Sequence, residues 1–183
     1  MVTDFDPFSS RNKLNIVQGE VRVSEDPTLL ITTLVGSCIS ACLFDPVSEV
    51  GGLNHFLLPE DPNGGDRVAL YGINQMELLI NSLLTIGAKR NRLQAKLFGG
   101  NTLHAGLSDV GSKNADLAET FLSHEGIPCV SRAIRGTQAQ RIQFHPTSGR
   151  ARMKYIQDAP VETIRKAPVV PVVSDGAGDL ELF

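Results

Sequence analysis

Short apolar runs, separated by breaks rich in Gly, Pro and Asp, make up most of the pattern along this chain. Such runs, bounded by turn residues, are typical of β-strands. We predict strands over residues 29–34, 38–44, 50–58, 93–98, 127–134, 141–144 and 150–156, with a weaker one around 15–23. The runs 38–44 and 50–58 are predicted to pair as a hairpin through the turn 45–50, because Asp45 and Pro46 are typical turn residues.

Two stretches instead show the spacing of amphipathic helices. The first has apolar residues at helical intervals, namely Ile73, Met76, Leu79, Ile80, Leu83 and Leu84. Gly87 follows it as a C-cap, and the second helix is predicted over 112–124, with Gly126 after its end. Strands outnumber helices and do not alternate regularly with them, so we predict an α+β fold: a mixed α/β layered sandwich with two main helices packed on β-sheets.

The composition changes at Asp158, where a stretch rich in Pro and Val begins and is followed by a Gly/Asp-rich end. We therefore predict one folded domain over residues 1–157 and a flexible tail over 158–183. The terminal segment 179–183 alternates acidic and apolar residues, which leaves a docking peptide as an alternative to a disordered end.

Charge and hydropathy argue against two classes of protein, nucleic-acid binders and membrane proteins. The chain has 183 residues, of which 17 are Lys or Arg and 20 are Asp or Glu, giving a net charge of −3. That balance argues against a nucleic-acid binder with a broad basic face. No apolar run approaches the ~20 residues that span a bilayer, and the polar N-terminus lacks a signal core. We expect a cytoplasmic protein without membrane insertion.

One group of residues suggests nucleophilic chemistry. A cysteine nucleophile needs a base to form the thiolate and donors for the oxyanion. Gly36 and Ser37 precede Cys38 at a break between two predicted strands, where a tight turn would aim the thiol and nearby N–H groups into one cleft. His55 lies on the facing strand of the predicted hairpin, and the hydroxyl of Thr32 is placed to hold its imidazole.

Other interpretations of these residues stay open at this point. A lone buried cysteine is usually a small apolar core residue. A zinc site built from Cys38, Cys42, His55 and His104 is conceivable, but their spacing fits no standard structural zinc pattern. The three cysteines of the chain do not make a disulfide framework.

Five motifs carry a resemblance to a known family. They span residues 32–38 (Thr-Thr-Leu-Val-Gly-Ser-Cys), 44–46, 51–59 (Gly-Gly-Leu-Asn-His-Phe-Leu-Leu-Pro), 96–101 and 110–114. In this order and spacing they resemble the CheD family, the chemoreceptor glutamine deamidases of bacterial chemotaxis, over roughly residues 15–156.

The resemblance implies a function and a set of site residues. Cys38 would be the nucleophile, His55 the base and Thr32 the residue that orients His55, with Gly36 and Ser37 shaping the oxyanion side of the cleft. The implied activity is that of a protein-glutamine glutaminase, without metal or organic cofactor. Its substrates would be glutamines of methyl-accepting chemotaxis proteins, with hydrolysis of glutamyl methyl esters as a further activity and a CheC-type phosphatase as a further partner.

The sequence departs from the family pattern at residues 136–141. The family usually carries Gly-Gly-x-x-Gly-Arg there, whereas this chain has Thr137 at the second Gly and Gln140 at the third. The departure keeps a second hypothesis open, in which the chain is a non-catalytic CheD-like binding module that regulates a receptor or a CheC-type phosphatase. The presence of Thr32, Cys38 and His55 together favours the enzyme.

Overall fold

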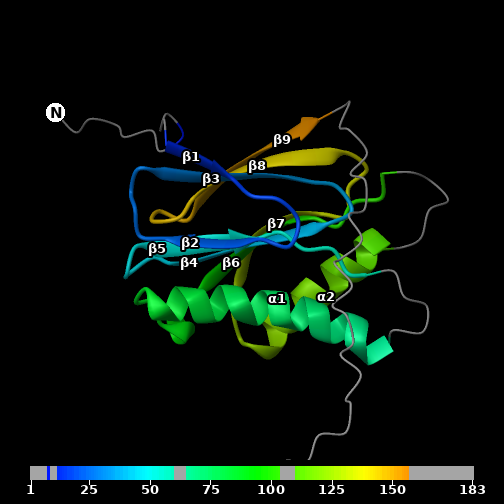
Figure 1. Cartoon of the computed structure of the whole chain (residues 1–183), viewed down its shortest axis with the longest axis horizontal. Coiled ribbons are helices and arrows are strands. Elements are labelled where there is room, and N and C mark those ends of the chain that lie inside the picture. Colours follow the sequence, from blue (N-terminus) through cyan, green and yellow to red (C-terminus); the bar gives the residue numbers. More distant parts are fainter. Residues whose placement is uncertain (1–7, 9–11, 60–64, 104–109, 157–183) are drawn as a thin grey trace, which may run out of the picture.

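Two β-sheets and a pair of helices form three layers in the computed structural model, which describes residues 8, 12–59, 65–103 and 110–156 (Figure 1). The outer sheet has the order β1 (Asn12–Asn15), β3 (Leu29–Val35), β8 (Ala139–His145) and β9 (Arg150–Ile156). The central sheet has the order β2 (Val21–Ser24), β5 (Val50–Asn54), β4 (Ile39–Asp45), β6 (Gln94–Gly99) and β7 (Cys129–Ile134). Helices α1 (Gly65–Thr85) and α2 (Val110–His124) cover the free face of the central sheet, and a short 3-10 helix, Arg90–Arg92, precedes β6.

The predicted α+β class with two main helices is confirmed. Strands β4 and β5 pair antiparallel up to Asp45 and Val50, as the hairpin prediction requires. Asp45 closes the turn with its own side chain, because its carboxylate accepts hydrogen bonds from the backbone N–H groups of Val47 and Ser48. Helix α1 ends as its glycine predicts: Gly87 adopts a φ of 100°, and Ala88 N–H donates to the carbonyl of Leu83.

The weak strand predicted around 15–23 is wrong in one respect that matters for the site. That region is two strands, β1 and β2, which belong to different sheets. The segment 16–20 crosses between them, so the chain passes from the outer to the central sheet at this point. The predicted tail 158–183, including its docking segment, lies outside the described residues, and the domain boundary stays a prediction.

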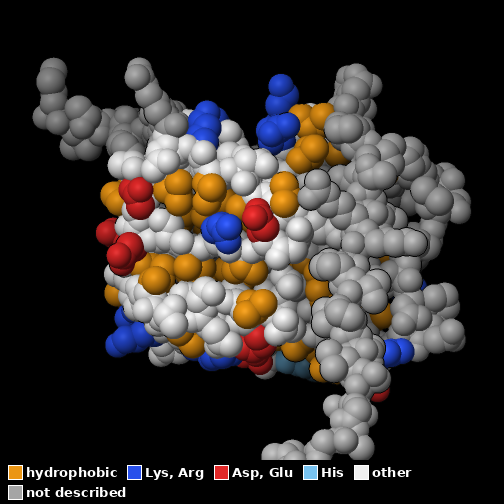
Figure 2. Space-filling view, in the orientation of Figure 1, with side chains coloured by type: hydrophobic (Ala, Val, Ile, Leu, Met, Phe, Trp, Pro, Cys, Tyr) orange, Lys and Arg blue, Asp and Glu red, His pale blue; other side chains and the backbone are white. Residues whose placement is uncertain are grey.

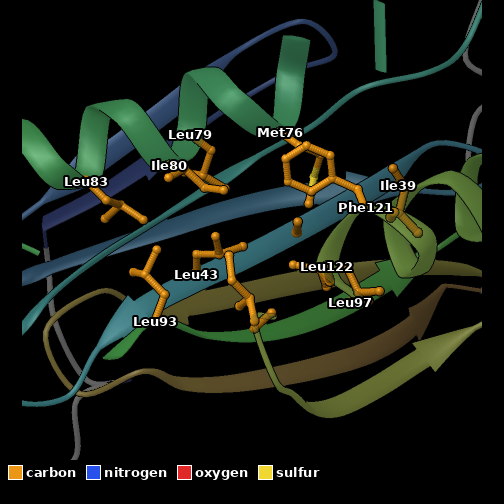
Figure 3. Packing of buried hydrophobic residues seen from close by; sticks show 14 of the residues in the cluster. Ile39, Leu43, Met76, Leu79, Ile80, Leu83, Leu93, Leu97, Phe121 and Leu122 are labelled. Carbon is orange, nitrogen blue, oxygen red and sulfur yellow. The ribbon is translucent and has the colours of Figure 1, made fainter. Parts of the chain in front are cut away.

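Two apolar cores follow from the three layers. The first lies between the helices and the central sheet, where Met76, Leu79, Ile80 and Leu83 of α1 and Phe121 and Leu122 of α2 meet Ile39, Leu43 and Leu97 (Figure 3). Ile73, the first residue of the predicted stripe, is instead 39% exposed. The second core lies between the two sheets and contains Ile16, Ile31, Val35, Cys42, Phe44, Leu53, Phe98, Ile142 and Phe144. The candidate site is built at one end of this second core.

The surface carries charges of both signs. On the face in Figure 2, Lys and Arg side chains are interspersed with Asp and Glu rather than gathered into one basic area. Within the described segments, neither helix combines the length and the apolar character that crossing a membrane requires.

Candidate active site

Cys38 lies in the bend that joins β3 to β4. Backbone hydrogen bonds from the residues that directly follow β6 hold this bend in place. Gly100 N–H donates to the Cys38 carbonyl at 2.7 Å, and Asn101 N–H donates to the Gly36 carbonyl at 2.9 Å. Gly99 is required for this approach, since a Cβ on it would lie 2.2 Å from the Cys38 carbonyl oxygen and its φ is 98°. The Cys38 side chain is buried.

His55 lies across the hairpin from Cys38. Ile39 and Phe56 exchange both backbone hydrogen bonds, at 2.9 and 3.0 Å, and their side chains face the helices. Because side chains alternate along paired strands, the residues just before them, Cys38 and His55, face the other way, toward the outer sheet. They form a diagonal cross-strand pair, whose Cα atoms typically lie about 7–8 Å apart.

The crossing segment 16–20 is hydrogen-bonded to the backbone of His55. Gly19 N–H donates to the His55 carbonyl at 2.6 Å, and His55 N–H donates to the Glu20 carbonyl at 3.0 Å. Both backbone hydrogen-bonding groups of His55 are therefore bonded to the segment that precedes β2. This pairing fixes the backbone from which the imidazole projects between the sheets.

The threonine that contacts His55 is Thr33, not Thr32. Thr33 Oγ1 lies 2.9 Å from His55 Nδ1, whereas Thr32 Oγ1 donates to Asn15 Oδ1 at 3.0 Å. The two neighbours point to opposite faces of β3, because side chains alternate along a strand. The face that Thr33 shares with Ile31 and Val35 is the one that looks toward the central sheet. The predicted contact between Thr32 and His55 is wrong for this reason.

Thr33 also decides which imidazole nitrogen carries the proton. Its single hydroxyl proton is donated to the Ile16 carbonyl at 2.9 Å, so the oxygen accepts from Nδ1–H of His55. The lone pair then sits on Nε2, a buried atom without a hydrogen-bond partner among the described residues. Burial lowers the pKa of His55 to about 4 despite the opposing effect of Glu20, so the imidazole is neutral at pH 7.

The carbonyls of the bend around Cys38 are held in place. The carbonyl of Gly36 accepts from Asn101 N–H, and the carbonyl of Ser37 accepts from Asn114 Nδ2 at 3.1 Å. In a trans peptide the N–H points away from the preceding carbonyl, so the N–H groups of Ser37 and Cys38 point away from these partners. The oxyanion role of this bend stays a prediction.

Asn114 of α2 joins the two halves of the site. It is fully buried; its Oδ1 accepts from Leu58 N–H at 2.8 Å, while its Nδ2 donates to the carbonyls of Ser37 and Val110. Leu58 follows His55 by three residues, and Ser37 precedes Cys38. One side chain thus fixes the segment after the imidazole relative to the bend before the thiol.

Replacing Asn114 with Ala is expected to lower the free energy of unfolding by about 2–4 kcal/mol, because it leaves a buried N–H and a buried carbonyl without partners. Urea unfolding monitored by circular dichroism measures the change. The exposed Asn74 of α1 is the matched control, and its replacement by Ala should change stability by less than about 0.5 kcal/mol. Equal stability of the Asn114→Ala variant and the unmodified chain would contradict the bridging role.

Cys38, Cys42 and His55, the described members of the zinc alternative, do not gather into a metal-binding group. In the described ranges no group of three or more His, Cys, Asp or Glu side chains is arranged to hold a metal, and His104 lies outside those ranges. Burial raises the pKa of the Cys42 thiol to about 12, so Cys42 is an inert part of the second core. Burial also raises the pKa of Cys129, which lies half-buried on β7.

A surface pocket lies beside His55. It is lined by Asn15, Ile16, Val17, Leu34, His55 and Arg141. The pocket lies where β1 ends and the crossing segment begins, and His55 itself is only 1% exposed.

Comparison with known proteins identifies the family of this chain. The family model for CheD chemotactic sensory transduction matches residues 57–155. The chain is 52% identical to a protein of Caulobacter sp. (strain K31) over 93% of both chains, and 45% identical to one of Agrobacterium fabrum over 96% of this chain and 98% of that one. Both relatives are named "Probable chemoreceptor glutamine deamidase CheD". The chain belongs to the CheD family.

Similarity to solved structures is weaker. A hypothetical protein of Bacillus licheniformis, YfiH, matches 69% of this chain and 61% of its own, with a TM-score of 0.44 and 11% identity. That score is too low to carry an inference about the site. The CheD relatives are more informative because they cover nearly the whole chain, including the part before residue 57 that holds Cys38 and His55.

The departure from the usual CheD pattern at 136–141 has a structural role in this chain. Gln140, which replaces a family glycine, is buried; its Oε1 accepts from Gly99 N–H at 3.1 Å and its Nε2 donates to the Ala133 carbonyl. Asn101 holds the preceding turn by accepting from Gly136 N–H and donating to the Gln138 carbonyl. The altered loop is therefore hydrogen-bonded to the end of β6 and the residues after it, the same segment that holds the bend around Cys38.

The sequence does not predict the roles of two site residues, Thr33 and Asn114. Thr33 and the predicted Thr32 are neighbours that point to opposite faces of β3. Residues on both faces of this strand are buried, so no alternation of polar and apolar residues shows which threonine faces His55. Asn114 stands in a motif that the CheD resemblance quoted, yet its contact with Ser37 joins residues 77 positions apart. Only the packing of α2 against the bend reveals its role.

Proposed function

We propose that this chain is a chemoreceptor glutamine deamidase that hydrolyses glutamine side chains of methyl-accepting chemotaxis proteins to glutamate. The activity is that of a cysteine-dependent protein-glutamine glutaminase. The proposal is supported by membership of the CheD family and by the names of the relatives, which describe chemoreceptor glutamine deamidases.

The observation that carries the proposal is the state of His55. Thr33 holds Nδ1–H, burial keeps the imidazole neutral, and Nε2 has no hydrogen-bond partner among the described residues, while Cys38 lies on the same face of the hairpin. A neutral imidazole beside a cysteine is the base that nucleophilic acyl transfer requires. A histidine that served only the core would not need an unpaired buried nitrogen.

The reaction proceeds in two halves. His55 Nε2 takes the Cys38 proton, and the thiolate forms a C–S bond with the amide carbon while the C=O π pair moves onto the oxygen. N–H groups of the Cys38 bend stabilise that oxyanion. When the C–N bond breaks, the imidazolium gives its proton to the departing nitrogen and ammonia leaves. Water then attacks the thioester with His55 as base, which releases glutamate and restores the thiol.

The same site supports a second hydrolytic activity. A glutamyl methyl ester is attacked in the same way, with methanol as the leaving group, so ester hydrolysis is proposed as a second activity of Cys38 and His55. No step uses a metal or an organic cofactor. The proposed location is the cytoplasm, where the receptor domains lie, and a CheC-type phosphatase is proposed as a second partner on the strength of the family resemblance alone.

The test is a mass-spectrometric map of glutamine-to-glutamate conversion. A recombinant cytoplasmic fragment of a methyl-accepting chemotaxis protein is incubated with the full chain, digested, and searched for peptides that gain about 1 Da. Conversion at defined glutamines with release of ammonia supports the proposal. A folded protein that binds the fragment and converts no glutamine would overturn it.

Thr33→Val is expected to reduce kcat by about 10-fold to 100-fold, because the hydroxyl that fixes the Nδ1–H tautomer is lost while the side-chain shape is kept. Thr32→Val is the matched control on the next position of β3; it loses only the bond to Asn15 and should keep kcat within about 3-fold. Steady-state ammonia release by both variants measures this. A larger loss from Thr32→Val than from Thr33→Val would show that the wrong threonine has been assigned.

A further inference from the structure

A glutamine of the chain itself contacts the nucleophile. The Cys38 thiol donates to Gln18 Oε1, with 3.8 Å between the sulfur and the oxygen. Gln18 belongs to the crossing segment 16–20 and is partly exposed, whereas Cys38 is fully buried. No step described above uses this side chain.

The turn that carries Gln18 is rigid. Glu20 N–H donates to the Val17 carbonyl at 3.1 Å, and Val17 N–H donates in return to Glu20 Oε2 at 3.0 Å. Gly19 has a φ of 89°, which fits the third position of a type II turn and puts Gln18 at its corner. The turn is bonded directly to the backbone of His55 through Gly19 and Glu20. The backbone of Gln18 is therefore held close to that of His55, and its carboxamide contacts the thiol.

We propose that Gln18 is a catalytic residue whose side-chain N–H donates to the oxygen that becomes negative when the thiolate adds to the substrate amide. This inference rests on the proposed function. In the resting site the thiol donates to Oε1; once the proton has moved to His55, a half-turn of the carboxamide presents Nε2–H instead. No proton is transferred in this contact: the C–S bond forms, the π pair moves onto oxygen, and the Gln18 N–H stabilises the resulting charge.

Placement favours this role. The turn that carries Gln18 is bonded to the backbone of His55, and the carboxamide already contacts the thiol in the resting site. Presenting the donor therefore needs only a rotation of the terminal amide and no movement of the chain.

The experiment compares ammonia release by the unmodified chain, Gln18→Ala, Gln18→Glu and Gln143→Ala on the same receptor fragment. Gln143 lies on β8, where its Oε1 accepts from Arg152, and it serves as the control. We expect Gln18→Ala to lower kcat by about 10²–10³-fold, the usual cost of one oxyanion donor, with KM changed by less than about 3-fold. Gln18→Glu, which keeps the shape and removes the donor, should fall at least as far, and Gln143→Ala should match the unmodified chain.

Three results would overturn the inference and leave the proposed function standing. Unchanged kcat in Gln18→Ala would remove the donor role while leaving the proposed function intact. A higher kcat in Gln18→Ala would show that Gln18 covers the thiol and must be displaced by the substrate. A gain of about 1 Da at Gln18 in the unmodified chain, absent from Cys38→Ala, would show that Gln18 is a substrate of its own site. Absence of turnover in the unmodified chain would overturn the proposed function and this role together.

Discussion

Cys38→Ala is expected to abolish glutamine deamidation, with kcat at least about 10⁴-fold below that of the unmodified chain, because no other group can form the thioester. The fold should persist. Cys38 sits in a bend whose hydrogen bonds run through backbone carbonyls and N–H groups, and the substitution removes only the sulfur. Receptor-fragment conversion followed by mass spectrometry, together with thermal unfolding, measures both parts of this prediction.

Cys42→Ala is the matched control, since Cys42 lies on the neighbouring strand and is equally buried. Its thiol has a pKa raised to about 12 by burial and takes no part in the chemistry. This variant should lose about 1 kcal/mol of stability and retain kcat within about 3-fold. Activity of Cys38→Ala within tenfold of the unmodified chain would rule Cys38 out as the nucleophile.

The second large effect is expected for His55→Gln, which should lower kcat by about 10³-fold or more through loss of the base. The same variant should also change how stability depends on pH. The pKa of His55 is about 4 in the folded chain and about 6.5 when the chain unfolds, so between these values the unfolded state binds one more proton. Lowering the pH from 6.5 to 4 therefore favours unfolding.

The size of this effect follows from the shift. The unmodified chain should lose about 3 kcal/mol more than His55→Gln over that pH window, since each unit of pKa corresponds to about 1.36 kcal/mol. Urea unfolding at a series of pH values between 6.5 and 4 gives the difference. His124→Gln, at the exposed end of α2, should follow the unmodified chain. Parallel pH curves for the unmodified chain and His55→Gln would mean that His55 is not held neutral by burial.

Much of the fold is readable in the sequence because local patterns specify it. The apolar spacing in α1 and the glycine after it predict a helix and its end without reference to the rest of the chain. The hairpin of β4 and β5 follows from two apolar runs around a turn that Asp45 closes with its own carboxylate. That hairpin already brings Cys38 and His55 onto neighbouring strands, so the nucleophile and the base are predicted from local signals together with the CheD motifs.

The remaining parts of the site depend on which elements come together. The region 15–23 has too weak an alternation to show that it divides between two sheets, and this division is what carries Gln18 to the thiol. The choice between Thr32 and Thr33 cannot be made from a strand that is buried on both faces, because polarity then gives no sign of direction.

By itself the sequence determined the helices, most of the strands and the hairpin, because short-range spacing and turn chemistry decide each of them, and its motifs carried the resemblance to the CheD family. The tertiary structure alone decided that Thr33 holds the imidazole, that Asn114 ties the two halves of the site, and that Gln18 lies against Cys38. These contacts join residues that are distant in sequence or differ only in the face they present. Their physical basis is the packing of one layer on another, which no local pattern encodes.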